Sequence, residues 1–303
     1  MAAFRYVVVD VFSTEPLAGN PLAVFTDAAT LDDSTMQKIA RELNLAETAF
    51  VFPPTREDCL ARVRIFTPAK EMMFAGHPTI GSAFVLLQEG VAPEGAGSFL
   101  LQEEIGAVPI RIEREQRPLI WLRMPRVSEG RSYDETVCAK ALGLGPDDVL
   151  PLKPQVLSAG NPTLVVAAKD KASVDRAFLD AACLKPIRAT EPEPFCVYVF
   201  AQTADGVYAR MFADDYGIYE DPATGSSMGP LAVFMMQHNL ISPSSRTRFV
   251  CEQGTKMGRR SLIQVDVRGG EEGIFVGGYV TPIVEAVMTL CCNGGSCEPK
   301  ENR

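Results

Sequence analysis

The chain has 303 residues, of which 47% are hydrophobic and 22% are charged, and its 29 basic and 38 acidic residues give a net charge of −9 at pH 7. A negative chain of this kind is poorly suited to nucleic acids or anionic membrane surfaces, because both are bound mainly through clustered cations. The apolar content is sufficient for a buried core and excludes a disordered chain, and the length suggests two domains of roughly 150 residues each.

The start of the chain predicts a cytoplasmic protein. Residues 7–9 are the only continuous apolar run before Asp10, which is too short for a signal peptide, and no segment approaches the roughly 18 to 20 apolar residues of a membrane span. We therefore expect the eight cysteines to be thiols. The spacing of Cys291, Cys292 and Cys297 matches no standard zinc site, so we expect no bound metal.

The first part of the chain predicts strands and a helix. β-Branched and aromatic residues indicate strands, and alternation of apolar and polar residues indicates a further strand that stops at Pro68. Apolar residues at helical spacing, with aspartates available as caps, predict one helix. The expected elements are strands over residues 4–12, 22–25, 49–52 and 61–68 and a helix over residues 31–43.

A second helix is expected to begin at His77 and Pro78, because proline is favoured at the first helical position. The residues that follow, SAFVLLQEG (82–90), are apolar on almost every side rather than along one stripe. A helix of this kind has to be buried on every side. We therefore expect it to lie inside a strongly curved sheet.

The second half of the chain repeats the first. The sequence Gly-Asn-Pro at residues 19–21 returns 141 residues later at residues 160–162. The motif that begins at His77 returns 144 residues later, as Asp-Pro-Ala-Thr-Gly-Ser beginning at Asp221. Matches in the same order at nearly the same distance indicate a duplicated domain.

The domain boundary is expected in the polar, proline-containing stretch between residues 117 and 132. We therefore predict domains of residues 1–118 and 119–303. Whether the C-terminal strand crosses back to the first domain stays open.

Both copies of the repeated motif place a polar residue, His77 or Asp221, at the expected N-cap of a helix. The first N–H groups of a helix have no partners within it, and the helix dipole adds to their attraction for anions. If the domains are related by a pseudo-two-fold axis, both helix starts face one cleft, which predicts a carboxylate or phosphate site. Two ordinary capped helices account for each motif by itself, but not for an imidazole at one start and a carboxylate at the other.

His77 and Glu47 are the candidates for proton transfer. The N–H donors of the helix start should favour the neutral form of the His77 ring. Glu47 has apolar residues on both sides of it in the sequence, and desolvation would raise its pKa to a range that suits proton transfer near neutral pH. An ordinary solvated glutamate in a loop is the alternative. The chain has no dinucleotide, P-loop, zinc-protease or nucleophile-elbow motif, so we expect chemistry without a cofactor.

The chain resembles the PhzF family, named for the isomerase of trans-2,3-dihydro-3-hydroxyanthranilate in phenazine biosynthesis. The resemblance runs over nearly the whole chain and is carried by DVFSTEPLAGNPLAVF (10–25), NLAETAFV (44–51), RIFTPAKEMMFAGHPTIGSA (64–83) and RMFADDYGIYEDPATGSS (210–227). It implies a diaminopimelate-epimerase-like fold, which is an α/β (α+β) architecture of two pseudo-symmetric domains. Each domain is a curved sheet around a central helix, and the active site lies between them.

The resemblance also implies site residues. It places the family's catalytic glutamate at Glu47, its supporting residues at His77, Asp221 and Ser226, and the glycines that contact the substrate carboxylate at Gly76 and Gly225. Related epimerases use two cysteines, but no cysteine lies at either helix start here. Family members are typically homodimers. One departure is Asp214, which stands where we expect a proline and leaves the substrate open.

We therefore expect a cofactor-independent isomerase that moves a proton between carbons of a small carboxylate, with Glu47 as the general acid and base. Two alternatives stay open. One is an epimerase or lyase with His77 or Asp221 as a second proton carrier, and the other is a non-catalytic protein that keeps the cleft for binding. The fold does not choose among substrates, because one fold hosts many reactions.

Overall fold

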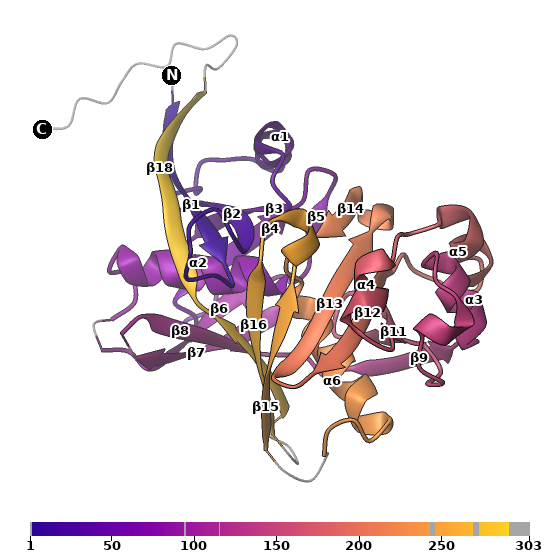
Figure 1. Cartoon of the computed structure of the whole chain (residues 1–303). Coiled ribbons are helices and arrows are strands. Elements are labelled where there is room, and N and C mark those ends of the chain that lie inside the picture. Colours follow the sequence, from indigo (N-terminus) through magenta and orange to yellow (C-terminus); the bar gives the residue numbers. More distant parts are fainter. Residues whose placement is uncertain (1, 94, 115, 243–245, 269–272, 291–303) are drawn as a thin grey trace, which may run out of the picture.

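The computed structural model describes residues 2–93, 95–114, 116–242, 246–268 and 273–290. The cysteine cluster near the C-terminus lies outside these residues, so the expectation that it binds no metal stays a prediction. Figure 1 shows the two halves of the chain side by side, with the last strand running back along the first. Among the described residues, no helix combines the length and apolar character needed to cross a membrane.

Strands and two helices make up the first half. In chain order its elements are β1 (Ala2–Val11), β2 (Asn20–Phe25), α1 (Asp33–Leu43), β3 (Glu47–Phe52), β4 (Ala61–Phe66), β5 (Glu71–Met72), α2 (Gly76–Gln88), β6 (Ser98–Glu103), β7 (Gly106–Arg114) and β8 (Pro118–Arg123). The helix expected over residues 31–43 is α1, and the Asp32 side chain caps it by accepting from the Thr35 N–H at 2.7 Å.

The second half has more helices on its outer side. Its elements are β9 (Ser128–Ser132), α3 (Glu135–Ala141), β10 (Gln155–Ser158), β11 (Pro162–Ala167), α4 (Lys171–Arg176), α5 (Ala181–Arg188), β12 (Cys196–Thr203), β13 (Gly206–Ala213), β14 (Ile218–Asp221), α6 (Met228–Gln237), β15 (Thr247–Gln253), β16 (Ser261–Arg268), β17 (Gly273–Gly278) and β18 (Val280–Leu290). Short 3-10 turns lie at Pro146–Asp148, Asp214–Tyr216, Gly225–Ser227 and Thr255–Met257.

Both halves pair their strands in the same order. In the first half, β2 is antiparallel to β1 and parallel to β3, and β4 is antiparallel to β3 and parallel to β6. In the second half, β11 is antiparallel to β10 and parallel to β12, and β13 is antiparallel to β12 and parallel to β15. Parallel neighbours need a crossover connection, which α1 and α2 supply in the first half and α4, α5 and α6 supply in the second. The repeat seen in the sequence is therefore a repeat of topology.

Two strands, β9 and β18, do not pair with the strand that precedes them in the chain. β9 follows β8 in the chain but pairs with β10, and β18 follows β17 but pairs with β1 along residues 2–11. The pair β8–β17 joins the two halves into one continuous sheet. The C-terminal strand thus lies against the first half, while the domain boundary at residue 118 stays a prediction.

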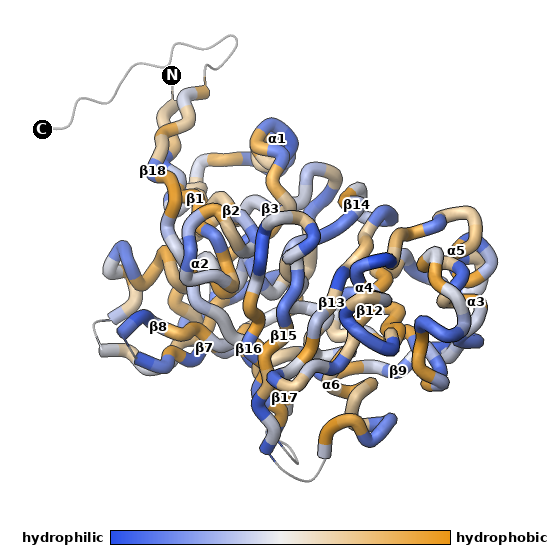
Figure 2. The backbone as a smooth tube through the Cα atoms, in the orientation of Figure 1, coloured by the Kyte–Doolittle hydropathy of each residue, from blue (hydrophilic) through white to orange (hydrophobic). Residues whose placement is uncertain are grey.

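α2 is surrounded by strands. All residues from Gly76 to Leu86 are buried, and the helix contacts strands β1, β2, β3, β4, β8, β17 and β18. In the second half, α6 is also mostly buried, and both helices belong to the main hydrophobic core. The prediction of an apolar helix inside a curved sheet is confirmed. α1 differs because it carries both polar and apolar residues, as Figure 2 shows, and buries only one side.

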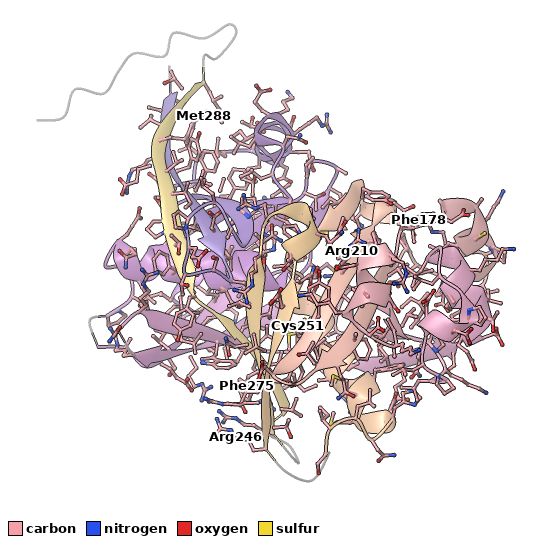
Figure 3. The ribbon with its side chains drawn as sticks, viewed as in Figure 1. Phe178, Arg210, Arg246, Cys251, Phe275 and Met288 are labelled. Carbon is pink, nitrogen blue, oxygen red and sulfur yellow. The ribbon has the colours of Figure 1, made fainter. Side chains whose placement is uncertain are left out.

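The outer faces of the two halves have separate smaller cores. α1 packs Met36, Ile39 and Ala40 against a cluster of phenylalanines on the first half. On the second half, Arg210 of β13 is buried, pairs with Glu220 at 2.8 Å and donates to backbone carbonyls at the end of α4 (Figure 3). The starts of α2 and of the turn before α6 lie away from these outer layers, where the two halves meet.

We expect the substitution Gly81→Ala to destabilise the fold. A Cβ atom on Gly81 would lie 2.5 Å from Cδ2 of Leu22 and 2.9 Å from Cγ2 of Val11, because α2 approaches β1 and β2 closely. Overpacking of this kind costs about 1–3 kcal/mol, which should exceed the roughly 1 kcal/mol gained from the better helix propensity of alanine. Denaturant unfolding measures the difference. The control is Gly97→Ala, an exposed position with no atom within 4 Å, and equal stability of the two variants would contradict the packing argument.

Candidate active site

Glu47 is the first residue of β3, and its side chain is only 14% exposed. The sequence predicts this strand over residues 49–52 only, whereas in the structure it already begins at Glu47. The Oε2 atom is buried and has no hydrogen-bond partner among the described residues. Burial, together with the nearby negative charge of Asp221, raises the pKa of this carboxyl well above its ordinary value. Glu47 is therefore able to hold a proton near neutral pH.

His77 lies beside Glu47 and is 4% exposed. Its Nε2 atom is 3.2 Å from Oε2 of Glu47, although the two atoms are not aligned as a hydrogen bond. Its Nδ1 atom is 3.2 Å from Nδ2 of Asn20, whose two hydrogens also face the shorter contacts to Asp221 Oδ1 and the Ala223 carbonyl. An N–H at Nδ1 would oppose this donor group, so the ring proton resides on Nε2. Burial lowers the pKa of the ring to about 3. His77 is thus a neutral imidazole with its N–H on the side of Glu47.

Asp221 faces these two groups from the second half of the chain. Its Oδ1 atom accepts from Nδ2 of Asn20 at 2.8 Å, and its Oδ2 atom accepts from the Thr224 hydroxyl at 2.5 Å. Burial raises the pKa of Asp221 to about 6, although both hydrogen bonds act in the opposite direction. Asn20 therefore connects His77 of one half with Asp221 of the other.

The two helix starts meet backbone to backbone. A Cβ atom on Gly76 would lie 2.9 Å from Cα of Gly225, a distance that no real side chain allows. Gly76 opens α2, and Gly225 opens the 3-10 turn that leads into α6. The first N–H groups of a helix have no acceptors within it and attract anions. Ser226 is 7% exposed and lies beside them, so this corner of the site suits a carboxylate.

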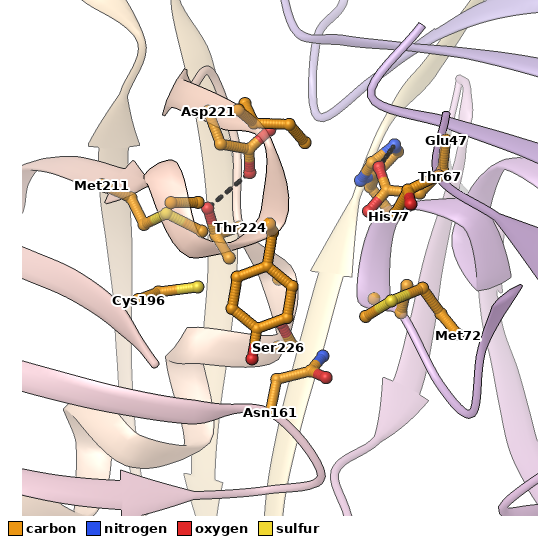
Figure 4. A pocket seen from close by; sticks show the side chains of 16 residues that line it. Glu47, Thr67, Met72, His77, Asn161, Cys196, Met211, Asp221, Thr224 and Ser226 are labelled. Carbon is orange, nitrogen blue, oxygen red and sulfur yellow. Dashed lines mark hydrogen bonds and ion pairs between the residues drawn. The ribbon is translucent and has the colours of Figure 1, made fainter. Parts of the chain in front are cut away.

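These residues line one cleft of about 510 Å³, counted to its open mouth. A concave cleft between two halves of a chain is a usual place for a small-molecule site. Figure 4 shows Glu47 and His77 on one side of the cleft and Asp221 and Thr224 on the other. The rest of the wall is mostly apolar and consists of Met72, Ala75, Cys196, Met211, Ala213, Tyr216 and Ile218, with Thr67 and Asn161 as further polar residues.

The structure brings together all six residues expected from the sequence. Glu47, His77, Asp221, Gly76, Gly225 and Ser226 all line the cleft. All six residues are therefore placed to contact one ligand bound in the cleft. Their chemical roles stay predictions.

Two expectations about the helix starts are wrong. α2 begins at Gly76 with Ala75 as N-cap, so His77 is its second residue and Pro78 its third. Asp221 ends β14 and caps no helix, because the backbone must still turn through residues 222–227 before α6 begins. Since Gly76 and Gly225 are the equivalent positions, His77 corresponds in space to Ser226 and not to Asp221.

The side chains that connect the two walls of the cleft by hydrogen bonds were not predicted from the sequence. Asn20 donates to the carbonyl of Ala223 at 2.9 Å, and Asn161 donates to the carbonyl of Phe74 at 3.3 Å. Each asparagine thus binds a backbone carbonyl of the other half. That carbonyl lies two residues before the glycine at the helix start of that half, which is Gly225 for Asn20 and Gly76 for Asn161. The repeated Gly-Asn-Pro sequence contained this signal, since both asparagines belong to it.

Gln253 is a further missed residue. It donates to the backbone carbonyl of Asp221 at 2.7 Å and to the Thr224 hydroxyl at 3.0 Å, and it is fully buried. No sequence motif marked it, because only the fold brings β15 next to the end of β14. Within the described part of the chain, no group of three His, Cys, Asp or Glu side chains is placed to hold a metal ion.

Comparison with known proteins places this architecture in one family. Residues 9–284 match the family described as "Phenazine biosynthesis-like protein" (PhzC-PhzF). The chain is 36% identical to an uncharacterised isomerase of Mesorhizobium japonicum, over 96% of this chain and all of that protein. It is 35% identical to the trans-2,3-dihydro-3-hydroxyanthranilate isomerase of Pseudomonas aeruginosa, over 89% of this chain and 92% of that enzyme.

Solved structures show the same fold. A phenazine biosynthesis protein of the PhzF family from Bacillus anthracis superimposes with a TM-score of 0.84 at 24% identity, over 96% of this chain and 100% of that one. The predicted fold class, with helices inside a strongly curved sheet in two similar halves, is confirmed.

We expect His77 to stay neutral when the pH is lowered from 8 to 5. The folded ring has a pKa of about 3, whereas an unfolded histidine takes up a proton near pH 6.5. The unfolded state therefore binds more protons, and His77 reduces stability by about 1.4 kcal/mol for each pH unit below roughly 6.5.

Nitrogen-15 NMR of the imidazole rings measures this directly. The expected spectrum shows a neutral Nε2–H tautomer throughout, assigned with the variant His238→Gln, which removes the other histidine. Conversion of the His77 signals to the imidazolium form above pH 5 would show that the ring is not desolvated as described.

Proposed function

The chain belongs to the phenazine biosynthesis-like (PhzC-PhzF) family, whose relatives are named isomerases, and we propose that it is an isomerase that moves a proton between two carbons of a small carboxylate without a cofactor. The observation that carries the proposal is the pair formed by Glu47 and His77, in which a buried carboxyl with a raised pKa lies 3.2 Å from a neutral imidazole.

The pair favours Glu47 as the proton carrier. A protonated Glu47 gives its proton to one carbon of the substrate and becomes a carboxylate, and it then takes a proton from another carbon, so no net proton is consumed. His77 is poorly suited to carry the proton, because burial strongly opposes its protonation. Its Nε2–H is instead placed to donate to Glu47 when that group is ionised, which stabilises the intermediate state.

Binding of the substrate carboxylate is proposed at the two helix starts. The unpaired N–H groups near Gly76 and Gly225 and the hydroxyl of Ser226 would hold the anion. The apolar wall around Met72, Met211 and Ile218 would then receive the carbon skeleton. Excluding water from this wall strengthens the electrostatic interactions inside the cleft and limits exchange of the transferred proton.

The substrate that the relatives suggest is trans-2,3-dihydro-3-hydroxyanthranilate, on which the Pseudomonas enzymes are named to act. We include it in the proposal as the first compound to test. A cytoplasmic location follows from the sequence expectation above, and a homodimer from the resemblance to the family. Both belong to the same proposal.

A second proton carrier is the alternative that one observation favours. Asp221 lies on the wall opposite Glu47 and also has a raised pKa, of about 6. In an epimerase or lyase on this scaffold, the two carboxyls would act on opposite faces of one substrate carbon.

We expect Glu47→Gln to lower kcat/KM for trans-2,3-dihydro-3-hydroxyanthranilate by at least about 100-fold, since a positioned acid or base contributes roughly 10²–10⁴ in rate. The assay follows the absorbance change in heavy water and the deuterium that enters the product. The exposed Glu42→Gln, five residues earlier on α1, is the matched control and should behave as the wild type.

The outcomes separate the hypotheses. Deuterium incorporation that disappears in Glu47→Gln supports one carrier, whereas retained exchange at one face of the substrate supports the second carrier. No conversion by folded wild-type protein would remove this substrate from the proposal. A Glu47→Gln variant that turns over like the wild type would remove Glu47 as the carrier.

A further inference from the structure

Glu103 is a buried carboxyl that the proposed reaction does not use. It is the last residue of β6, is 4% exposed and faces inward on the same side of the strand as Leu101. Burial raises its pKa to about 8. The hydrogen bond with the Thr79 hydroxyl acts on this pKa in the opposite direction, and no charged neighbour among the described residues contributes to the shift.

The hydrogen bonds around Thr79 decide the protonation state. The Thr79 hydroxyl oxygen lies 2.5 Å from Oε1 of Glu103 and 2.7 Å from the carbonyl oxygen of Ala75. A hydroxyl has one hydrogen, and a carbonyl only accepts. If Glu103 were ionised, one of these two short contacts would contain no hydrogen. If Glu103 is protonated, it donates to Thr79, Thr79 donates to Ala75, and both contacts are satisfied.

The repeat provides an independent observation. The position equivalent to Glu103 is Gln253, which is the last residue of β15, the strand parallel to β13 as β6 is parallel to β4. Gln253 also faces inward, and its amide donates to a threonine hydroxyl, that of Thr224, at 3.0 Å. The second half therefore fills this position with a side chain that never ionises and that donates to a threonine beside the helix start.

We propose that Glu103 is a positioning residue that is kept as a neutral carboxylic acid and holds the start of α2 in place. It donates to Thr79, which donates to the carbonyl of Ala75, the N-cap residue directly before Gly76 and His77. If Glu103 lost this proton, one of these two hydrogen bonds would be lost. Both lie next to the start of α2, which forms part of the cleft wall. The proposal does not depend on the identity of the substrate or on the role of Glu47.

Infrared spectroscopy tests the protonation state. Wild-type protein at pH 7 should show a carbonyl stretch of a protonated carboxyl group that disappears in Glu103→Gln and persists in the control Glu104→Gln, an exposed neighbour. Other buried carboxyls, such as Glu47, contribute equally to all three proteins and cancel in the difference spectra. An unchanged band in Glu103→Gln would overturn the proposal.

Thermal unfolding against pH tests the energetic consequence. The folded state keeps the Glu103 proton up to about pH 8, whereas the unfolded state loses it near pH 4.5, so this group's contribution to wild-type stability is lost as the pH rises between these values. The melting temperature of Glu103→Gln relative to the wild type should therefore rise steadily from pH 5 to pH 8. A difference that is independent of pH, or that falls, would contradict a neutral acid.

Hydrogen exchange tests the positioning role. In Glu103→Ala, the Thr79 amide, which donates to the Ala75 carbonyl at 3.3 Å, and the amides of Ile80 and Gly81 in the same turn of α2 should exchange faster than in the wild type. In Glu103→Gln they should stay protected, because the glutamine amide still donates to Thr79. Equal exchange at these residues in the alanine variant would show that Glu103 does not hold the helix start. Exchange that rises equally throughout the chain would show a general loss of stability instead.

Discussion

The backbone of Gly76 lies against the backbone of Gly225, and the rest of the cleft is arranged around this contact. Gly76 has no room for a side chain, and a Cβ atom on Gly225 would lie only 3.3 Å from Cα of Gly76. The starts of α2 and of the turn before α6 can therefore approach this closely only because glycine stands at the contact. Asn20 and Asn161 hold the arrangement by binding carbonyl groups across the junction. The pairs β1–β18 and β8–β17 also join the two halves through backbone hydrogen bonds.

A consequence of this contact is that three ionisable side chains are buried together. Burial disfavours every charged form, so it raises the pKa values of Glu47 and Asp221 and lowers that of His77. Hydrogen bonds from Asn20 and Thr224 partly offset this effect at Asp221, whereas Oε2 of Glu47 receives no such bond from the residues that the structure describes. The same low-dielectric setting thus gives two carboxyls different proton affinities, which is how proteins separate the acid and base roles of similar groups.

The halves have the same topology but different chemistry at equivalent positions. At the helix starts, His77 corresponds to Ser226, and below them Glu103 corresponds to Gln253. A duplicated scaffold supplies two converging helix starts, and the differences between the copies make the cleft asymmetric. This asymmetry agrees with the proposed reaction with one proton carrier, because only one wall of the cleft carries the Glu47 and His77 pair.

Several features of this protein follow from the sequence alone. The duplication, the apolar helices inside the sheet and the candidates Glu47, His77 and Asp221 are visible there, because periodicity and repeated motifs are local properties of the chain. Gly76, Gly225 and Ser226 were added by the resemblance to the PhzF family. The N-cap assignments of His77 and Asp221 were wrong because a Pro-containing motif does not reveal which residue begins the helix.

Only the tertiary structure decided which groups touch. The link from Asn20 to Asp221 joins residues 201 positions apart, and the carboxyl of Glu103 at the end of β6 reaches Thr79 of α2. The protonation states of Glu47, His77, Asp221 and Glu103 are also decided by the tertiary structure. They depend on how completely neighbouring elements exclude water, and no spacing along the chain records that exclusion.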